Sequence, residues 1–184
     1  MIYAQLMKEV LNNKELMLNL ELASELNLPQ WCIVGGAIRD HFWGLHTPQS
    51  KYTPKDIDLI FFDPKDCSKT LEQNIEDNLK EISGKMWSVK NQARMHEHNS
   101  DTPYLGTLDA ISKFPLQVVT TALSIASDGE PLLVTIYGYQ DLIVPAINPT
   151  IHYQTKERRR SLVEYIERKK FSKLWPQAKL AEFI

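Results

Sequence analysis

Two stretches decide the fold: Trp31-Cys32-Ile33-Val34-Gly35-Gly36-Ala37-Ile38-Arg39-Asp40 and Asp56-Ile57-Asp58-Leu59. In the first, an apolar run meets a Gly-Gly turn and continues with apolar residues at helical spacing, which predicts a strand that leads directly into a helix. The backbone amides at the start of such a helix can bind phosphate, and glycine lets the phosphate approach them closely. We therefore expect Gly35 and Gly36 to form a phosphate-binding turn.

The second stretch opens with two aspartates separated by one residue. On a strand, Asp56 and Asp58 point to the same face, and that face continues with the apolar Ile60 and Phe62. Two neighbouring carboxylates repel each other unless a cation lies between them, and Mg²⁺ or Mn²⁺ prefers oxygen ligands. The pair is thus a candidate metal site; the residues alone leave a solvated strand edge as the alternative.

Basic residues near these stretches are candidate phosphate ligands. Arg39, in the first turn of the expected helix, either binds phosphate or pairs with Asp40 or Asp58. Lys90 and Arg94 lie close together in the chain and either neutralise phosphates or belong to a polar strand end with surface charges.

Composition restricts the classes of protein. With 43% hydrophobic and 24% charged residues, the 184-residue chain is typical of a globular domain. A net charge of -2 gives no overall basic field for long nucleic acid, and no apolar run is long enough for a membrane span. Two isolated cysteines suit a reducing cytoplasm better than a disulfide framework, so we expect a cytoplasmic location.

Charge is unevenly distributed along the chain. Residues 156–173 contain eight basic and three acidic residues, so this segment has a formal net charge of +5 and the remainder of the chain has −7. We expect residues 1–150 to form the main domain, with its N-terminal helices, and residues 151–184 to form a basic helical tail packed on it. The tail is either a solvated face or a contact for an acidic partner or RNA.

Periodicity and turn signals place the other elements in an α/β (α+β) fold, a mixed β-sheet flanked by helices. An Asp-Gly turn at residues 128–129, between two β-rich runs, predicts a hairpin that extends the sheet. We expect helices at residues 3–26 (one or two), 68–82, 107–113 (capped by Thr107) and 156–173, strands at 31–34, 56–62, 86–92, 118–126 and 132–137, and a loop at 46–55.

The two stretches together resemble a known superfamily. Gly-Gly-x-x-Arg-Asp, a glycine near the helix end, a loop and Asp-x-Asp on a strand are similar to the nucleotidyltransferases of the DNA polymerase β superfamily, most closely to the head of CCA-adding enzymes and poly(A) polymerases. This likeness covers about residues 31–62. A second likeness, to a small bacterial family of nucleotidyltransferase-like proteins, is carried by Val89-Lys90-Asn91-Gln92-Ala93-Arg94-Met95-His96, Pro103-Tyr104, Thr107, Asp109-Ala110, Thr120-Thr121-Ala122 and Tyr137-Gly138-Tyr139-Gln140-Asp141-Leu142.

The resemblance implies roles for the candidate residues. Gly35 and Gly36 would face the triphosphate of a nucleotide, and Asp56 and Asp58 would hold Mg²⁺ or Mn²⁺ and take part in catalysis. Arg39, Lys90 and Arg94 would be further nucleotide-binding residues.

One feature departs from the family pattern. Transferases of the superfamily usually carry a third carboxylate on a later strand, but residues 86–92 contain no Asp or Glu. Either Asp109 supplies it as a third catalytic residue, or the site has two acids, or the protein binds nucleotide without turnover.

The function we expect is metal-dependent transfer of a nucleoside monophosphate from an NTP to a hydroxyl. The near-neutral charge favours a small-molecule or protein acceptor over nucleic acid, with no membrane partner. The alternatives are a non-catalytic nucleotide-binding or interaction protein of the same fold, and an RNA-binding protein that uses the basic tail.

Overall fold

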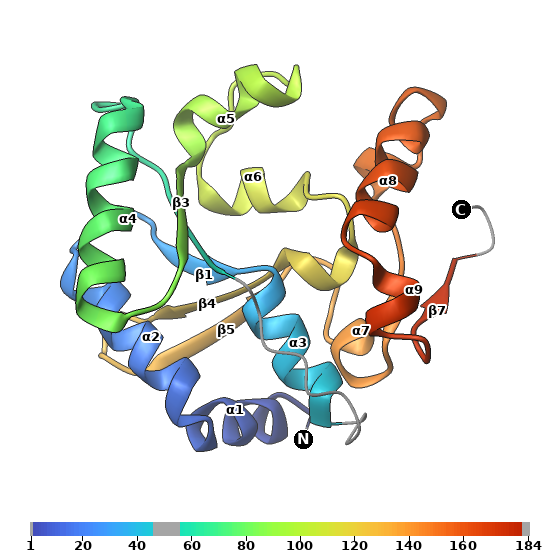
Figure 1. Cartoon of the computed structure of the whole chain (residues 1–184), viewed down its shortest axis with the longest axis horizontal. Helices are drawn as coiled ribbons and strands as arrows, with labels where there is room; N and C mark the ends of the chain where they lie inside the picture. Colours follow the sequence, from blue (N-terminus) through green and yellow to red (C-terminus); the bar gives the residue numbers. More distant parts are fainter. Residues whose placement is uncertain (1, 46–55, 182–184) are drawn as a thin grey trace.

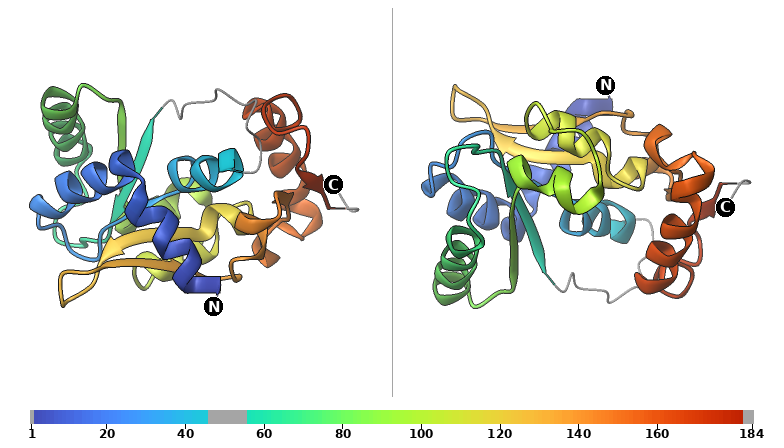
Figure 2. Two further views of the ribbon diagram at one scale, coloured as in Figure 1. Left: turned by 90° about the horizontal axis from the view of Figure 1, so that it is seen from below. Right: turned by 90° about the horizontal axis from the view of Figure 1, so that it is seen from above.

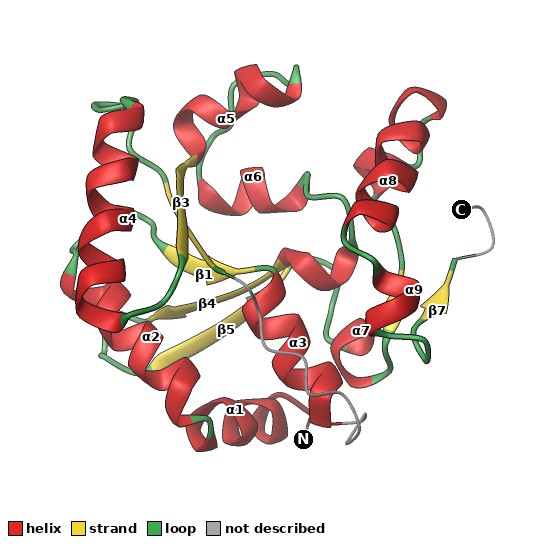
Figure 3. Ribbon diagram, in the orientation of Figure 1, coloured by secondary structure: helices red, strands yellow, loops and turns green. Residues whose placement is uncertain are grey.

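The computed structural model describes residues 2–45 and 56–181; the loop expected at 46–55 lies outside this part. Helices and strands alternate along much of the chain (Figures 1 and 3). In chain order the elements are α1 (Ile2–Asn12), α2 (Lys14–Glu25), β1 (Cys32–Val34), α3 (Gly36–Leu45), β2 (Ile57–Phe61), α4 (Lys69–Ser83), β3 (Trp87–Asn91), α5 (Gln92–Asn99), α6 (Thr107–Ser112), the 3₁₀ turn η1 (Gln117–Thr120), β4 (Thr121–Ile125), β5 (Pro131–Thr135), α7 (Gln140–Ile143), β6 (Ala146–Ile147), η2 (Ile151–Tyr153), α8 (Lys156–Arg168), α9 (Phe171–Leu174) and β7 (Lys179–Leu180).

The larger sheet is mixed, as expected. Its strands follow the order β3-β2-β1-β4-β5, with β2 and β3 parallel and the other neighbours antiparallel. The expected hairpin is β4 and β5, and Gly129 in its turn has φ +86°. Figure 2 shows α1 and α2 on one side of the sheet and α5 and α6 on the other.

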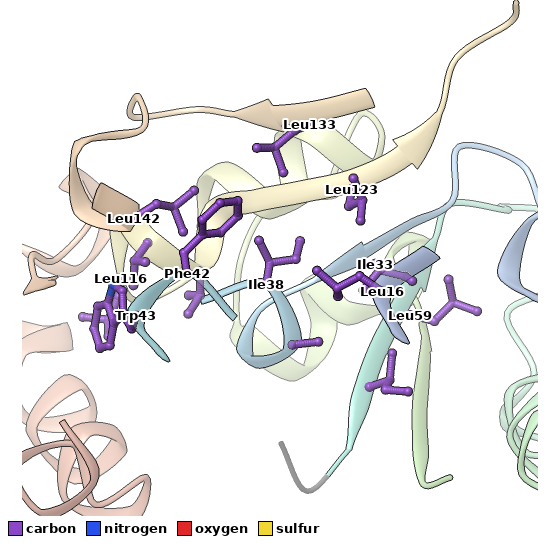
Figure 4. Packing of buried hydrophobic residues seen from close by; sticks show 14 of the residues in the cluster. Leu16, Ile33, Ile38, Phe42, Trp43, Leu59, Leu116, Leu123, Leu133 and Leu142 are labelled. Carbon is purple, nitrogen blue, oxygen red and sulfur yellow. The ribbon is translucent and has the colours of Figure 1, made fainter. Parts of the chain in front are cut away.

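The strand register determines which side chains lie on each face of the sheet. Ile33 pairs with Leu59, and both belong to the large hydrophobic core that α1, α2, α3 and α4 help to build (Figure 4). Val34 pairs with Asp58, so these side chains lie on the opposite face, where Ile60 and Ile111 of α6 belong to a smaller cluster. The strand that places Leu59 in the core therefore also places Asp58 on the other face of the sheet.

Helix α4 covers the edge strand β3. Ser68 caps the helix by accepting from the Leu71 amide, and Gly84 ends it in the left-handed conformation with φ +69°. Two carboxylates of α4 accept from β3 amides: Glu72 from Asn91 (2.7 Å) and Glu76 from Val89 (2.7 Å). These contacts satisfy backbone donors of an edge that would otherwise be open.

The C-terminal segment packs on the same core. Leu162 and Ile166 of α8, Phe171 of α9 and Trp175 are buried in the large cluster, and β7 pairs in parallel with β6. Among the helices of the described chain, none has the length and apolarity that a membrane span requires.

Three local expectations were wrong. Residues 118–120 lie in η1 instead of a strand, because the chain turns there: the Val119 amide donates to the Leu116 carbonyl and the Thr120 hydroxyl donates to the Gln117 carbonyl. Gly106, not Thr107, precedes α6, because the Thr107 hydroxyl donates to the Gln30 carbonyl instead of capping the helix. The basic helix is interrupted: Lys170 adopts φ +53° between α8 and α9.

Candidate functional site

A cavity of about 380 Å³ lies on the sheet face that carries Asp58. Its wall combines the β1–α3 turn, β2 and the residue before it, β3, α5, the end of α6 and the end of α8. Segments far apart in sequence therefore meet here. Of the sequence-predicted residues, Gly35, Gly36, Arg39, Asp56, Asp58 and Lys90 line this cavity.

The Gly-Gly turn presses directly against Asp58. Gly35 has φ +72°, and a Cβ added to it would lie 3.0 Å from Asp58 Oδ2. Its carbonyl accepts the Arg39 amide at 3.1 Å, which begins α3. Only glycine combines this backbone conformation with this close approach, so the first amides of α3 lie beside the carboxylate.

The folded protein disfavours the ionised form of the Asp58 carboxylate. The register partner of Asp58 on β3 is Ser88, whose side chain lowers the pKa of this carboxylate. Burial, and next the charge of Asp56, raise the pKa of Asp58 to about 6, although Lys169, Ser88 and Arg39 act in the opposite direction. A cation between the two carboxylates would remove this repulsion.

The donor set of the acid pair fits a divalent cation. Two carboxylates and a nearby hydroxyl are oxygen ligands, which Mg²⁺ and Mn²⁺ prefer. Mg²⁺ is commonly held by one or two carboxylates, with water and substrate phosphates as its remaining ligands. Asp56 and Asp58 could therefore supply the carboxylate ligands of such a metal ion.

Arg39 forms the ion pair that the sequence left as one of its alternatives. Its Nε donates to Asp40 Oδ1 at 2.7 Å, and Nη2 lies 2.6 Å from the same oxygen. The guanidinium also stacks on the Phe171 ring, 4.8 Å from its centroid. Contacts with Asp40 of α3 and Phe171 of α9 thus position Arg39 at the cavity wall.

Lys90 and Arg94 have carboxylate partners on α4. Lys90 Nζ donates to Glu76 Oε1 at 2.8 Å while lining the cavity. Arg94 forms a two-pronged pair with Glu72 and lines a neighbouring pocket with it. The structure therefore does not bring Arg94 together with the acid pair.

Asp109 pairs with Lys113 and not with the acid pair. Its carboxylate accepts from Lys113 Nζ at 3.1 Å and from the Leu105 amide at 3.0 Å. Among residues 2–45 and 56–181, no three His, Cys, Asp or Glu side chains come together in a way that would hold a metal ion. The structure thus does not join Asp109 to Asp56 and Asp58.

Sequence reasoning missed the contribution of the tail. Tyr165, Arg168 and Lys169 line the cavity, as does Tyr153 before α8. The charge run identified a basic helix but gave no signal of which side chains face the site. Ser88 was missed because its position opposite Asp58 depends on strand register.

Comparisons with known proteins agree with this geometry. A family model described as "Nucleotidyltransferase" matches residues 21–180. An NMR structure described as revealing a CCA-adding enzyme head domain is 25% identical, with a TM-score of 0.86 over 97% of this chain and 95% of that one. Among curated proteins, no sequence matches the chain.

Larger enzymes share the fold alone. The Thermotoga maritima CCA-adding enzyme complexed with tRNA is 16% identical, with a TM-score of 0.59 over 97% of this chain and 42% of that one. A tRNA nucleotidyltransferase complexed with a primer tRNA and an ATP analogue is 15% identical, with a TM-score of 0.56 over 88% of this chain and 46% of that one. The chain spans less than half the length of these two enzymes. Since the family model covers most of the sequence and the fold agrees, this chain belongs to the nucleotidyltransferase family.

Proposed function

We propose that this protein transfers a nucleoside monophosphate from an NTP to a hydroxyl of a small-molecule or protein acceptor. One observation carries the proposal: the Gly35 turn and the Asp58 carboxylate are so close that a Cβ would lie 3.0 Å from Oδ2. The Gly-Gly helix start, which we propose binds phosphate, and the acid pair both line one cavity. This is the arrangement that a metal-bound triphosphate requires.

Each residue has a defined task in this proposal. Gly35 and Gly36 present backbone amides to the phosphates, and Arg39 adds guanidinium donors at the same wall while it remains paired with Asp40. Asp56 and Asp58 hold divalent metal, which when bound neutralises charge on the attacking and leaving oxygens of phosphoryl transfer. Lys90 offsets charge from the β3 side while it remains paired with Glu76.

Net charge and cavity size support the proposed small-molecule or protein acceptor. A cavity of about 380 Å³ is at the small end of ligand sites and suits one nucleotide. The net charge of -2 supplies no general attraction for a nucleic-acid acceptor. RNA is the alternative acceptor, because two of the similar structures are complexes with tRNA. Cys32 and Cys67 are both free thiols, which is consistent with work in a reducing cytoplasm.

The two-acid site leaves a second candidate function, nucleotide binding without turnover. The absence of a three-ligand cluster in the described part of the chain favours it over a three-acid enzyme. Pyrophosphate release by the wild type decides between turnover and binding alone, and Asp109→Ala then tests whether an active protein uses a third acid. If Asp109 is a third catalytic acid, Asp109→Ala should lower kcat and leave nucleotide affinity unchanged, since the acid acts in the transition state. If Asp109 serves only as the partner of Lys113, the substitution should leave kcat unchanged.

The direct test is titration of the protein with the four NTPs and Mn²⁺, followed by an assay for pyrophosphate release. We expect Asp58→Asn to abolish Mn²⁺-dependent NTP binding, because it removes a metal ligand. Asp77→Asn, an exposed carboxylate of α4, is the matched control and should bind as the wild type does. Unchanged binding by Asp58→Asn would contradict the site.

A further inference from the structure

The cations of the cavity differ in whether they are already neutralised. Ion pairs hold Arg39 to Asp40, Lys90 to Glu76 and Lys113 to Asp109. Two further cations line the cavity from the end of α8, and within the described residues neither makes an ion pair with a carboxylate. These two are Arg168 and Lys169.

Lys169 acts electrostatically on the acid side of the site. Its charge lowers the pKa of both Asp40 and Asp58, against the larger effect of burial. Arg168 lies over the Tyr165 ring, 5.7 Å from its centroid, and Tyr165 also lines the cavity. Lys169 therefore belongs to the electrostatic environment of the acid pair, and Arg168 lines the same cavity.

The end of α8 is connected to the Gly-Gly turn through contacts of the residues that follow it. The Lys169 amide donates to the Tyr165 carbonyl at 3.0 Å, and Lys170 then turns the chain with φ +53°. Phe171 follows at once and packs against the Arg39 guanidinium. Because Arg39 belongs to α3, this contact ties Lys169 to the helix that begins at the Gly-Gly turn.

We propose that Arg168 and Lys169 bind the polyphosphate of the nucleotide, so that the C-terminal tail completes the site and selects triphosphates over monophosphates. This rests on the proposed function, since it assumes that a nucleotide occupies the cavity. Two cations without carboxylate partners suit a ligand that brings more negative charge than the bound metal cancels. A monophosphate placed at the Gly-Gly turn and the acid pair would need them far less.

The test compares ATP and AMP binding, each with Mn²⁺, by calorimetry on the full chain. We expect the double variant Arg168→Gln/Lys169→Gln to lose about 10- to 100-fold in ATP affinity and less than about threefold in AMP affinity. The matched control is Lys156→Gln/Lys173→Gln, which removes the same charge from exposed tail positions outside the cavity lining. Lys169→Arg keeps the charge and should retain ATP binding.

The outcomes separate this inference from the proposed function. If the wild type binds ATP and the double variant binds it as well as the control does, the inference is wrong while the proposed function stands. Equal losses for ATP and AMP would also overturn it, because the cations would then not distinguish the polyphosphate. If the wild type binds no NTP with Mn²⁺, the proposed function fails and this inference fails with it.

Discussion

At the scale of single residues, Asp58 makes stability depend on pH. Burial and the charge of Asp56 raise its pKa to about 6, so the folded protein keeps a proton that the unfolded chain has lost. In metal-free protein, this contribution to the free energy of unfolding therefore falls as the pH rises from about 4 to about 6. Asp58→Asn should remove this fall and increase the free energy of unfolding at pH 7 by on the order of 1–3 kcal/mol.

Urea unfolding in EDTA at a series of pH values measures this effect. The variant should show a flatter stability profile than the wild type over the acidic range, while Asp77→Asn, an exposed carboxylate, should follow the wild type. A variant that is less stable at pH 7, with the wild-type pH profile, would show that the carboxylate is structural.

Gly35 provides a second prediction at this scale, with a matched control in the hairpin turn. Gly35 and Gly129 both have positive φ, but a Cβ at Gly129 meets no atom within 4 Å. Alanine at either position should cost about 1–2 kcal/mol for its backbone conformation. Only Gly35→Ala should also weaken Mn²⁺-dependent NTP binding, because its Cβ displaces the Asp58 carboxylate. Equal binding by the two variants in calorimetry would place the phosphate site elsewhere.

At the scale of elements, the contact of α4 with β3 depends on a buried carboxylate. Glu72 is 3% exposed, accepts from the Asn91 amide and pairs with Arg94. Glu72→Ala should cost about 2–4 kcal/mol, because it leaves a buried donor and a guanidinium without their acceptor. Chemical denaturation measures the loss, and Asp77→Ala on the exposed side of α4 should change stability by less than about 0.5 kcal/mol.

Chemical denaturation, together with a measurement of NTP affinity, also tests the role of Arg94. If Arg94 serves mainly the fold, Arg94→Ala should destabilise the protein and leave NTP affinity unchanged. A loss of NTP affinity without a loss of stability would support the phosphate-binding role that the sequence suggested.

At the scale of the whole molecule, the tail and the main body should unfold together. Trp175 packs on Trp43 of α3 with ring centroids 5.6 Å apart, and Phe171 is 1% exposed in the same core. Phe171→Ala should therefore cost about 3–5 kcal/mol. Ile151→Ala, at a tail residue that is 72% exposed, should cost less than about 0.5 kcal/mol.

Two probes followed during one denaturation test this cooperativity. In a Trp31→Phe/Trp87→Phe background, tryptophan fluorescence reports on Trp43 and Trp175 at the contact between tail and body, and far-ultraviolet circular dichroism reports on all helices. Coincident transitions indicate one folding unit. An earlier fluorescence transition would show that residues 151–184 fold as a separate unit.

The sequence by itself determined the features that depend on neighbours along the chain. The strand, Gly-Gly turn and helix at residues 31–45, the Asp-x-Asp strand and the Asp-Gly hairpin were all predicted from local spacing. Periodicity, turn chemistry and capping act over a few residues, so a single sequence displays them directly. The family resemblance used the same local motifs, and it was confirmed.

Only the tertiary structure decided which charges are neutralised and which face the cavity. Arg94 meets Glu72, and Lys90 meets Glu76, because α4 packs along β3 and the start of α5, and sequence spacing does not specify these contacts. Lys169 reaches the site of Asp58 because Phe171 and Trp175 bury the tail against the core. Electrostatic partnership depends on distance in space and on burial, and both arise only when the whole chain has packed.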